Sequence, residues 1–169
     1  FFLLVHSSDV ETLPSAKSIK LPESIAEKAP KQTVVVTVND QDGKAVALAT
    51  VGAPGWTLVY FYPKADTPGC TKQACSLRDA YAKLADIGVQ VIGVSSDDSA
   101  DQKKFQEKYK LPFTLVADTD KKVMDAFGVP HTLGFASRQA FLVHDGKLVW
   151  RDLSASTAEQ AADVLAAIQ

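Results

Sequence analysis

The chain has 169 residues, of which 46% are apolar and 22% charged, and its formal net charge is −2. This length suits a single domain whose core needs no disulfide or metal, and the balanced charge argues against a nucleic-acid binder, which would show a basic surface. No apolar run approaches the ~20 residues that a membrane-spanning helix needs, and a total of two cysteines excludes a disulfide framework and a four-cysteine zinc site.

The first 32 residues are predicted to be an N-terminal extension that lies on, or trails from, a domain at 33–169. The apolar run at 1–5 is too short for a signal peptide. It is compatible with the tail of a processed leader, an expression remnant or a truncated start. We favour a cytoplasmic protein, with an extracytoplasmic (periplasmic) location if the run is a leader remnant.

The domain is predicted to begin with a β-hairpin. Thr33–Val38 is rich in β-branched residues and predicts a strand, 39–43 is a turn, and Lys44–Leu48 is a possible return strand. Thr57–Tyr62 is almost continuously apolar, which is typical of a strand buried on both faces, and Pro63 ends it.

Helices and strands alternate along the rest of the chain. Apolar residues recur at three or four positions from Ala74 to Leu84 and predict a helix that Gly88 ends. The later predicted elements are a strand at 89–94, a helix from Asp98 or Ser99 to about Lys110, a strand at 114–116, a helix that Asp118 or Thr119 caps and Gly128 ends, a hairpin at 140–150 around Asp145-Gly146, and a last helix that Ser156 or Thr157 opens. This order predicts an α/β fold, in which a central mixed sheet carries helices on both faces. A thioredoxin-like architecture fits it.

Cys70 and Cys75 carry the most informative chemistry in the sequence. The preceding loop places Cys70 in the first turn of a helix, beyond the carboxyl end of a buried strand, where ligands bind in open α/β sheets. The unpaired N–H groups and the macrodipole of a helix start favour a thiolate, which is a nucleophile. On an α-helix the two Cα atoms would lie roughly 8–9 Å apart, beyond the range of about 4.4–6.8 Å for a disulfide. Either the helix does not form here, or its first turn unwinds on oxidation.

The residues taken one at a time leave plainer interpretations open. Two structural thiols or a static disulfide would explain the cysteine pair about as well as redox chemistry. Thr67 alone favours a helix-start hydroxyl, Pro63 a strand terminator, and Arg138 a solvated surface residue. The three histidines are scattered, with no carboxylate or cysteine at ligand spacing, so we predict no metal site.

The segment from Pro63 to Asp79 resembles the active-site loop of the peroxiredoxins. Pro63, Thr67 and Cys70 form the pattern P-x-x-x-T-x-x-C. The string T-P-G-C-T-x-Q-A-C-x-L-R-D, which starts at Thr67, is similar to the bacterioferritin comigratory protein (peroxiredoxin Q) subfamily. The resemblance extends from about residue 33 to residue 169 and includes R-Q-A-F-L-V, which starts at Arg138.

This resemblance implies a thiol-dependent peroxidase that reduces hydrogen peroxide and organic hydroperoxides. Cys70 corresponds to the peroxidatic cysteine, which becomes a sulfenic acid. Cys75 corresponds to the resolving cysteine, which forms an intramolecular disulfide that thioredoxin or a similar donor reduces. Thr67 corresponds to the threonine that hydrogen-bonds the peroxide, Pro63 to the proline that walls the pocket, and Arg138 to a distant arginine that supports the thiolate.

The same resemblance implies that no metal or organic cofactor is needed, because the electrons come from sulfur. We expect a monomer, since an intramolecular cysteine pair needs no partner subunit, and neither a nucleic-acid nor a membrane partner. The rival hypothesis is a thioredoxin-type thiol–disulfide exchange protein that acts on protein partners. Such proteins usually carry C-x-x-C, and the four-residue gap counts against it. A third hypothesis is a non-catalytic scaffold that has kept the fold.

Overall fold

The computed structural model describes residues 37–40, 42, 45–47 and 54–169. The predicted extension and the predicted domain start at 33 lie outside the described residues. The strands are β1 (Thr37–Asp40), β2 (Ala45–Ala47), β3 (Trp56–Phe61), β4 (Val89–Ser95), β5 (Thr114–Ala117), β6 (His131–Thr132), β7 (Phe135–Ala136), β8 (Gln139–His144) and β9 (Lys147–Asp152). The helices are α2 (Pro68–Asp79), α3 (Tyr81–Asp86), α4 (Ser99–Tyr109), α5 (Lys122–Phe127) and α6 (Gln160–Ile168).

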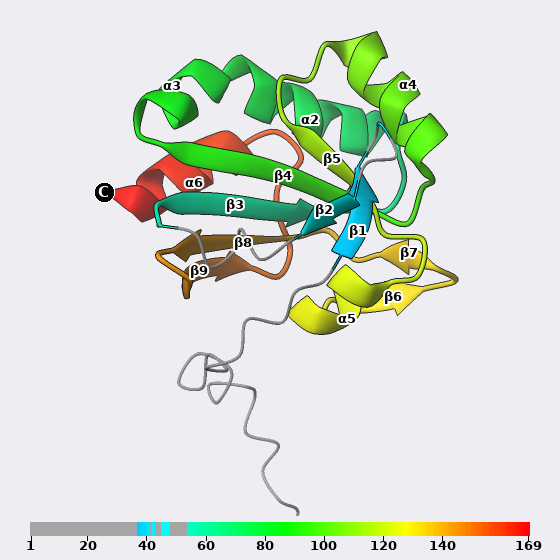
Figure 1. Cartoon of the computed structure of the whole chain (residues 1–169). Coiled ribbons are helices and arrows are strands. Elements are labelled where there is room, and N and C mark those ends of the chain that lie inside the picture. The colour runs from blue at the N-terminus through cyan, green and yellow to red at the C-terminus, as the bar shows by residue number, and fades with distance from the viewer. Residues whose placement is uncertain (1–36, 41, 43–44, 48–53) are drawn as a thin grey trace, which may run out of the picture.

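A seven-stranded mixed sheet forms the centre of the described part, in the order β2-β1-β5-β4-β3-β8-β9 (Figure 1). β3, β4 and β5 run parallel to one another. β1 is antiparallel to β5, and β8 is antiparallel to β3. The sequence predicted a mixed sheet of this kind from its order of elements, in which alternating strands and helices lie between two β-hairpins and a last helix follows. The structure confirms it.

The side chains of β3 divide the core into two parts, because successive residues of a strand point to opposite faces of the sheet. Leu58 and Tyr60 belong to one buried cluster, which also contains residues of α2, α3, α4 and α6. Val59 and Phe61 belong to the other, which contains residues of α5. Helices therefore cover both faces, as predicted, and α5 lies on the opposite side of the sheet from α2 and α3 (Figure 1).

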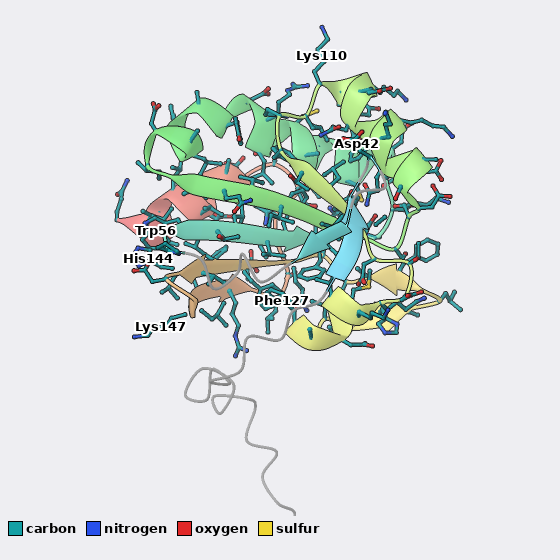
Figure 2. The ribbon with its side chains drawn as sticks, viewed as in Figure 1. Asp42, Trp56, Lys110, Phe127, His144 and Lys147 are labelled. Atoms are coloured by element: carbon teal, nitrogen blue, oxygen red, sulfur yellow. The ribbon has the colours of Figure 1, made fainter. Side chains whose placement is uncertain are left out.

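The two ends of β3 have different surroundings. At its start, the Trp56 ring stacks on the His144 ring at the end of β8, with 4.1 Å between centroids (Figure 2). Just past its end, the Tyr62 N–H donates to the Val94 carbonyl at 3.1 Å. The chain then enters the loop before α2, so the sheet extends up to the segment that carries the cysteine pair.

Several predicted elements are confirmed closely. α4 ends at Tyr109 and is capped at its start by the Asp98 carboxylate, which accepts from the Asp101 N–H at 2.9 Å. The β8–β9 turn has Asp145 at φ 49° and Gly146 at φ 74°. Both values lie in the left-handed region that a two-residue hairpin turn requires.

Other predicted boundaries were wrong. The helix predicted to run on to Gly88 is two helices, α2 and α3, with a bend at Ala80 (φ −94°, ψ 1°). The Ala80 N–H still donates to the Ser76 carbonyl at 3.2 Å, and the Leu84 N–H donates to the Ala80 carbonyl at 3.1 Å. The chain therefore bends with little loss of hydrogen bonding and with its apolar spacing intact, and for this reason the sequence does not reveal the break.

The last two helices start later than predicted. The Asp118 carboxylate accepts from the Met124 N–H at 2.9 Å, so it caps α5 from four residues before the helix begins. The Ser156 hydroxyl accepts from the Glu159 N–H at 3.0 Å and closes a turn that precedes α6. The short hairpin of β6 and β7 was not predicted, because two-residue strands leave no alternating pattern to detect.

The N-terminal hairpin is described only in part. β1 begins at Thr37 and β2 covers Ala45–Ala47, whereas 33–36, 44 and 48 of the predicted strands lie outside the described residues. The two strands are antiparallel, as predicted. None of the described helices has the length and apolar character that crossing a membrane demands.

Candidate functional site

Cys70 lies in the first turn of α2, where the sequence predicted it. Thr67 is the residue before the helix, with an extended backbone (φ −88°, ψ 154°), and Pro68 is the first helical residue. Proline suits this position because it has no N–H to leave unpaired. The Thr67 carbonyl accepts from the Thr71 N–H at 2.8 Å and starts the helical bonding. The Cys70 thiol therefore stands at the positive end of the helix dipole.

Arg138 contacts the Cys70 sulfur directly. Its Nη2 donates to Cys70 Sγ at 3.4 Å, and the cysteine is only 1% exposed. Strand pairing explains how a distant arginine reaches this site, because Gln139 is paired with Phe61 at the end of β3. A guanidinium beside a buried sulfur favours the thiolate over the thiol. Arg138 is therefore not the solvated surface residue that it would be on composition alone.

Gly69 allows the arginine to lie against the helix. A Cβ at this position would come within 3.2 Å of Arg138 Nη2 and 3.7 Å of the Thr157 methyl carbon. The first of these distances is tighter than an ordinary van der Waals contact, so a side chain here would require the guanidinium to shift by a few tenths of an ångström. Gly69 belongs to the T-P-G-C string, but the sequence alone indicates no role for it.

Two buried glutamines complete the hydrogen bonds around Arg138. Arg138 Nη1 donates to Gln73 Oε1, and Gln73 Nε2 donates to Gln160 Oε1 at the start of α6. Gln73 is 0% and Gln160 1% exposed. Sequence reasoning missed both residues. The available signal was a glutamine one turn after Cys70, on the same helix face as Ala74 and Leu77, which are both buried.

Thr67 and Pro63 lie in the loop between β3 and α2, and both are half-buried. The Thr67 hydroxyl donates to the Lys64 carbonyl at 3.0 Å and makes no capping bond to α2. The helix-start role that Thr67 alone suggested is therefore not seen for its side chain. Because a hydroxyl that donates one hydrogen bond still has acceptor lone pairs, Thr67 Oγ1 remains able to accept another.

Two carboxylates hold this loop in place. Asp97 Oδ2 accepts from the Ala65 N–H and from the Ser95 hydroxyl, each at 2.7 Å. Asp66 accepts from the Lys108 ammonium at 2.7 Å and from the Tyr109 hydroxyl at 2.6 Å. The hydrogen bond from Lys108, and then that from Tyr109, lowers the pKa of the Asp66 carboxyl group. The backbone around Pro63 and Thr67 is thereby tied to the ends of β4 and α4.

A buried polar network lies behind the loop. The Tyr62 hydroxyl donates to Gln102 Oε1, and Gln102 Nε2 donates to the Ser95 hydroxyl at 2.7 Å and to the Val116 carbonyl at 3.0 Å. Burial raises the pKa of Tyr62, so its hydroxyl keeps its proton and remains a donor. This network connects the residue that follows β3 with β4, β5 and α4.

Cys75 is half-buried and belongs to the same unbroken helix as Cys70. Both thiols are free. Of the two alternatives left by the sequence, the helix does form here, so a bond between the two sulfurs requires the first turn of α2 to unwind. Among the described residues there is no group of three or more His, Cys, Asp or Glu that could hold a metal ion.

Comparison with known proteins gives a consistent family assignment. The AhpC/TSA family matches residues 25–151. Chloroplastic peroxiredoxin Q from Oryza sativa subsp. japonica is 54% identical over 98 residues, which are 57% of this chain and 44% of that protein. The chain thus spans less than half the length of this relative.

Solved structures agree in fold. Peroxidoxin BcpB from Mycobacterium tuberculosis superposes with a TM-score of 0.73 and 32% identity, over 79% of this chain and 90% of that one. The bacterioferritin comigratory protein of Xanthomonas campestris, studied for its alkyl peroxide reduction activity, superposes with a TM-score of 0.74 and 28% identity, over 82% of this chain and 93% of that one. These matches confirm the thioredoxin-like architecture and the peroxiredoxin Q resemblance, and the chain belongs to the AhpC/TSA family.

Proposed function

We propose that this protein is a thiol-dependent peroxidase that reduces hydrogen peroxide and organic hydroperoxides. The observation that carries the proposal is the 3.4 Å hydrogen bond from the Arg138 guanidinium to the buried Cys70 sulfur, at the start of α2. A purely structural thiol gains nothing from a cation held against it. A nucleophilic thiolate gains stabilisation both from the cation and from the helix dipole.

In the first step, the Cys70 thiolate attacks one peroxide oxygen. The S–O bond forms as the O–O bond breaks, the sulfur loses two electrons, and the departing oxygen takes a proton to become water or an alcohol. Thr67 Oγ1 accepts a hydrogen bond from the peroxide, while Arg138 stabilises the charge as it passes from sulfur to oxygen. Pro63 forms a wall of the pocket. Because Cys70 is 1% exposed, we expect only a small group such as a hydroperoxide to reach the sulfur.

In the second step, Cys75 attacks the sulfenic acid at Cys70. A disulfide forms, and the hydroxyl leaves as water. Because the two cysteines occupy one intact helix, this step follows the unwinding of the first turn of α2. A dithiol reductant of the thioredoxin type then returns both sulfurs to thiols, at the expense of its own oxidation to a disulfide.

The rival hypothesis of a thiol–disulfide exchange protein is less well supported. Such a protein needs a nucleophilic sulfur that reaches the disulfide of a macromolecular partner. Cys70 is buried, whereas the half-buried Cys75 lies in the body of α2, away from the helix start that favours a thiolate. These features favour a small substrate for Cys70.

We propose a monomer, a reductant of the thioredoxin type and a single domain from 33 to 169. The cytoplasm remains our proposed location, with the extracytoplasmic space as the alternative. The name of the rice relative adds the chloroplast as a third compartment to examine. Subcellular fractionation with an antibody to the native protein distinguishes the three, and sedimentation of the reduced protein tests the monomer.

The decisive experiment is a stopped-flow mix of the reduced protein with hydrogen peroxide. We expect Cys70→Ser to lose the reaction, whereas Cys75→Ser should keep the first step and accumulate a sulfenic acid that dimedone traps. A Cys70 that oxidises no faster than a free thiol would reject the peroxidase. Turnover with thioredoxin and with other dithiols then identifies the class of reductant.

A further inference from the structure

We propose that Gln160 is a positioning residue for the peroxide reaction: acting through Gln73, it holds Arg138 on the Cys70 sulfur and keeps the first turns of α2 wound. This inference rests on the proposed function and deepens it. Among the described residues, the Gln160 side chain hydrogen-bonds Gln73 and makes no hydrogen bond to either cysteine. It acts on the site through the bonds that join α6 to Gln73 and Arg138.

The segment 155–160, here called the C-terminal strap, contacts both Arg138 and α2. The Ala155 N–H donates to the Arg138 carbonyl at 3.2 Å. The Ser76 hydroxyl on α2 donates to the Ala158 carbonyl at 2.8 Å. The Gln73–Gln160 bond is the third link, and it is the one that continues to the sulfur through Arg138. The strap thus fastens the helix and the arginine to the same short stretch of chain.

The donor and acceptor types fix the direction of this chain of bonds. An arginine has donors only, so Gln73 must turn its Oε1 toward Arg138. Its Nε2 then needs an acceptor, and Gln160 Oε1 provides one. Gln160 Nε2 is itself buried, with no hydrogen-bond partner among the described residues. A buried unpaired donor is unfavourable. We infer that Gln160 is kept in this place for the oxygen that it offers to Gln73.

The two steps of the reaction should respond to Gln160 in opposite directions. A fixed Gln73 keeps the guanidinium aimed at the thiolate, which favours attack on the peroxide. The same bond holds Gln73, which lies in the second turn of α2, and so resists any unwinding that extends beyond the first turn, which slows disulfide formation. Removal of the acceptor should therefore slow the first step and speed the second. A general loss of stability would not by itself slow the attack on the peroxide.

The test uses Gln160→Met, which keeps the length of the side chain and removes its oxygen. In stopped-flow traces of the full chain, the first step is the phase whose rate rises with hydrogen peroxide concentration, and disulfide formation is the phase whose rate does not. We expect the first to slow about three- to tenfold and the second to quicken by a similar factor, as for the loss of one hydrogen bond.

Two comparisons separate positioning from general damage. Val164→Ala removes buried volume from the same helix and leaves both glutamines unchanged. It should leave the first phase within about twofold of the parent. In a Gln73→Met background, Gln160→Met should add almost nothing, because the bond through which it acts is already lost. Equal slowing in both backgrounds, or no slowing in the parent, would overturn the proposal.

A measurement on the unaltered protein covers the case in which Gln160→Met does not fold. The Cys70–Cys75 disulfide is made with diamide, which needs no peroxidase activity, and amide hydrogen exchange is compared with that of the reduced form. We expect faster exchange in α2 and in residues 157–163, which cover the end of the C-terminal strap and the first turn of α6. The reason is that Gln160 loses its hydrogen bond to Gln73 when α2 unwinds. Unchanged exchange in 157–163 would reject the role of Gln160. If the parent protein does not react with peroxide, the proposed function is rejected, but the hydrogen-exchange result for residues 157–163 remains valid.

Discussion

The Cys70 sulfur accepts a hydrogen bond from a residue that lies 68 positions away in the chain. Arg138 reaches the sulfur because β8 is paired with β3 and because Gly69 leaves room beside the helix. The guanidinium then divides its donors between Cys70 and Gln73. Each of these features is needed to bring a permanent cation next to a buried sulfur, where the low local dielectric strengthens its effect.

Replacement of Arg138 should affect the chemical step far more than the fold. We expect Arg138→Ala to slow the peroxide reaction about ten- to a hundredfold, as for the loss of a hydrogen bond from a charged donor. Stopped-flow rates of the variant and of the parent protein measure this effect. Arg151→Ala on the exposed edge strand is the matched control, and similar slowing there would remove Arg138 from the site.

The residues of the site differ in how far the sequence reveals them. Cys70, Thr67 and Pro63 form one short string, so local spacing and the family resemblance place Thr67 and Cys70 at the start of a helix and Pro63 in the loop before it. Arg138 came from the resemblance alone, because strand pairing between distant segments cannot be read from a short motif. Gln73 and Gln160 were missed, since a glutamine has no preferred chemistry until its hydrogen-bond partners are known.

The loop between β3 and α2 is held by bonds from other elements and makes few of its own. Asp97 follows β4 and binds the Ala65 N–H, while α4 supplies Lys108 and Tyr109 to Asp66. Asp66 has φ 58°, a left-handed value that a non-glycine residue adopts at some cost. Contacts from two neighbouring elements thus hold a strained turn in the shape that presents Thr67.

Asp97 and the next residue, Asp98, form a natural pair of variants for testing this role. Asp97→Ala removes the acceptor of the Ala65 N–H, so we expect the peroxide reaction to slow about three- to tenfold. Asp98→Ala removes the cap of α4 and should cost about 0.5–2 kcal/mol of stability, with the rate nearly unchanged. Stopped-flow rates and urea unfolding of both variants decide the matter. Equal slowing of the peroxide reaction by the two substitutions would show that Asp97 acts only through the general stability of the fold.

At the level of elements, the sequence predicts types better than ends. The order of strands and helices follows from periodicity and turn residues, and both the β8–β9 turn and the α4 cap were placed correctly. The break at Ala80 was missed because the apolar spacing continues through it. The start of α6 was missed because Ser156 lies in a strap whose path is set by Arg138 and α2, and those contacts are not local.

At the scale of the whole molecule, two tyrosines lie at the centre of the larger core. Tyr60 and Tyr62 are fully buried, and their rings stack with 5.5 Å between centroids. Burial, and then the neighbouring tyrosine, raises the pKa of Tyr60 well above its ordinary range, and burial does the same to Tyr62. The two differ in hydrogen bonding, because the Tyr62 hydroxyl binds Gln102 whereas that of Tyr60 has no partner among the described residues.

These buried phenols should make the fold sensitive to alkaline pH. A raised pKa in the folded state means that the stabilisation is complete below about pH 10 and is lost as the pH rises, because only the unfolded chain releases the proton. Each tyrosine should contribute a loss of about 1.4 kcal/mol per pH unit above that point. Urea unfolding between pH 8 and about pH 11.5 measures the slope. Tyr60→Phe and Tyr62→Phe should each make it shallower by about that amount. A parent slope that neither variant changes would show that these hydroxyls ionise within the folded protein.

At neutral pH the stabilities of the two variants should differ. Tyr62→Phe leaves Gln102 without its donor and should cost about 1–3 kcal/mol of unfolding free energy, whereas Tyr60→Phe loses no hydrogen bond.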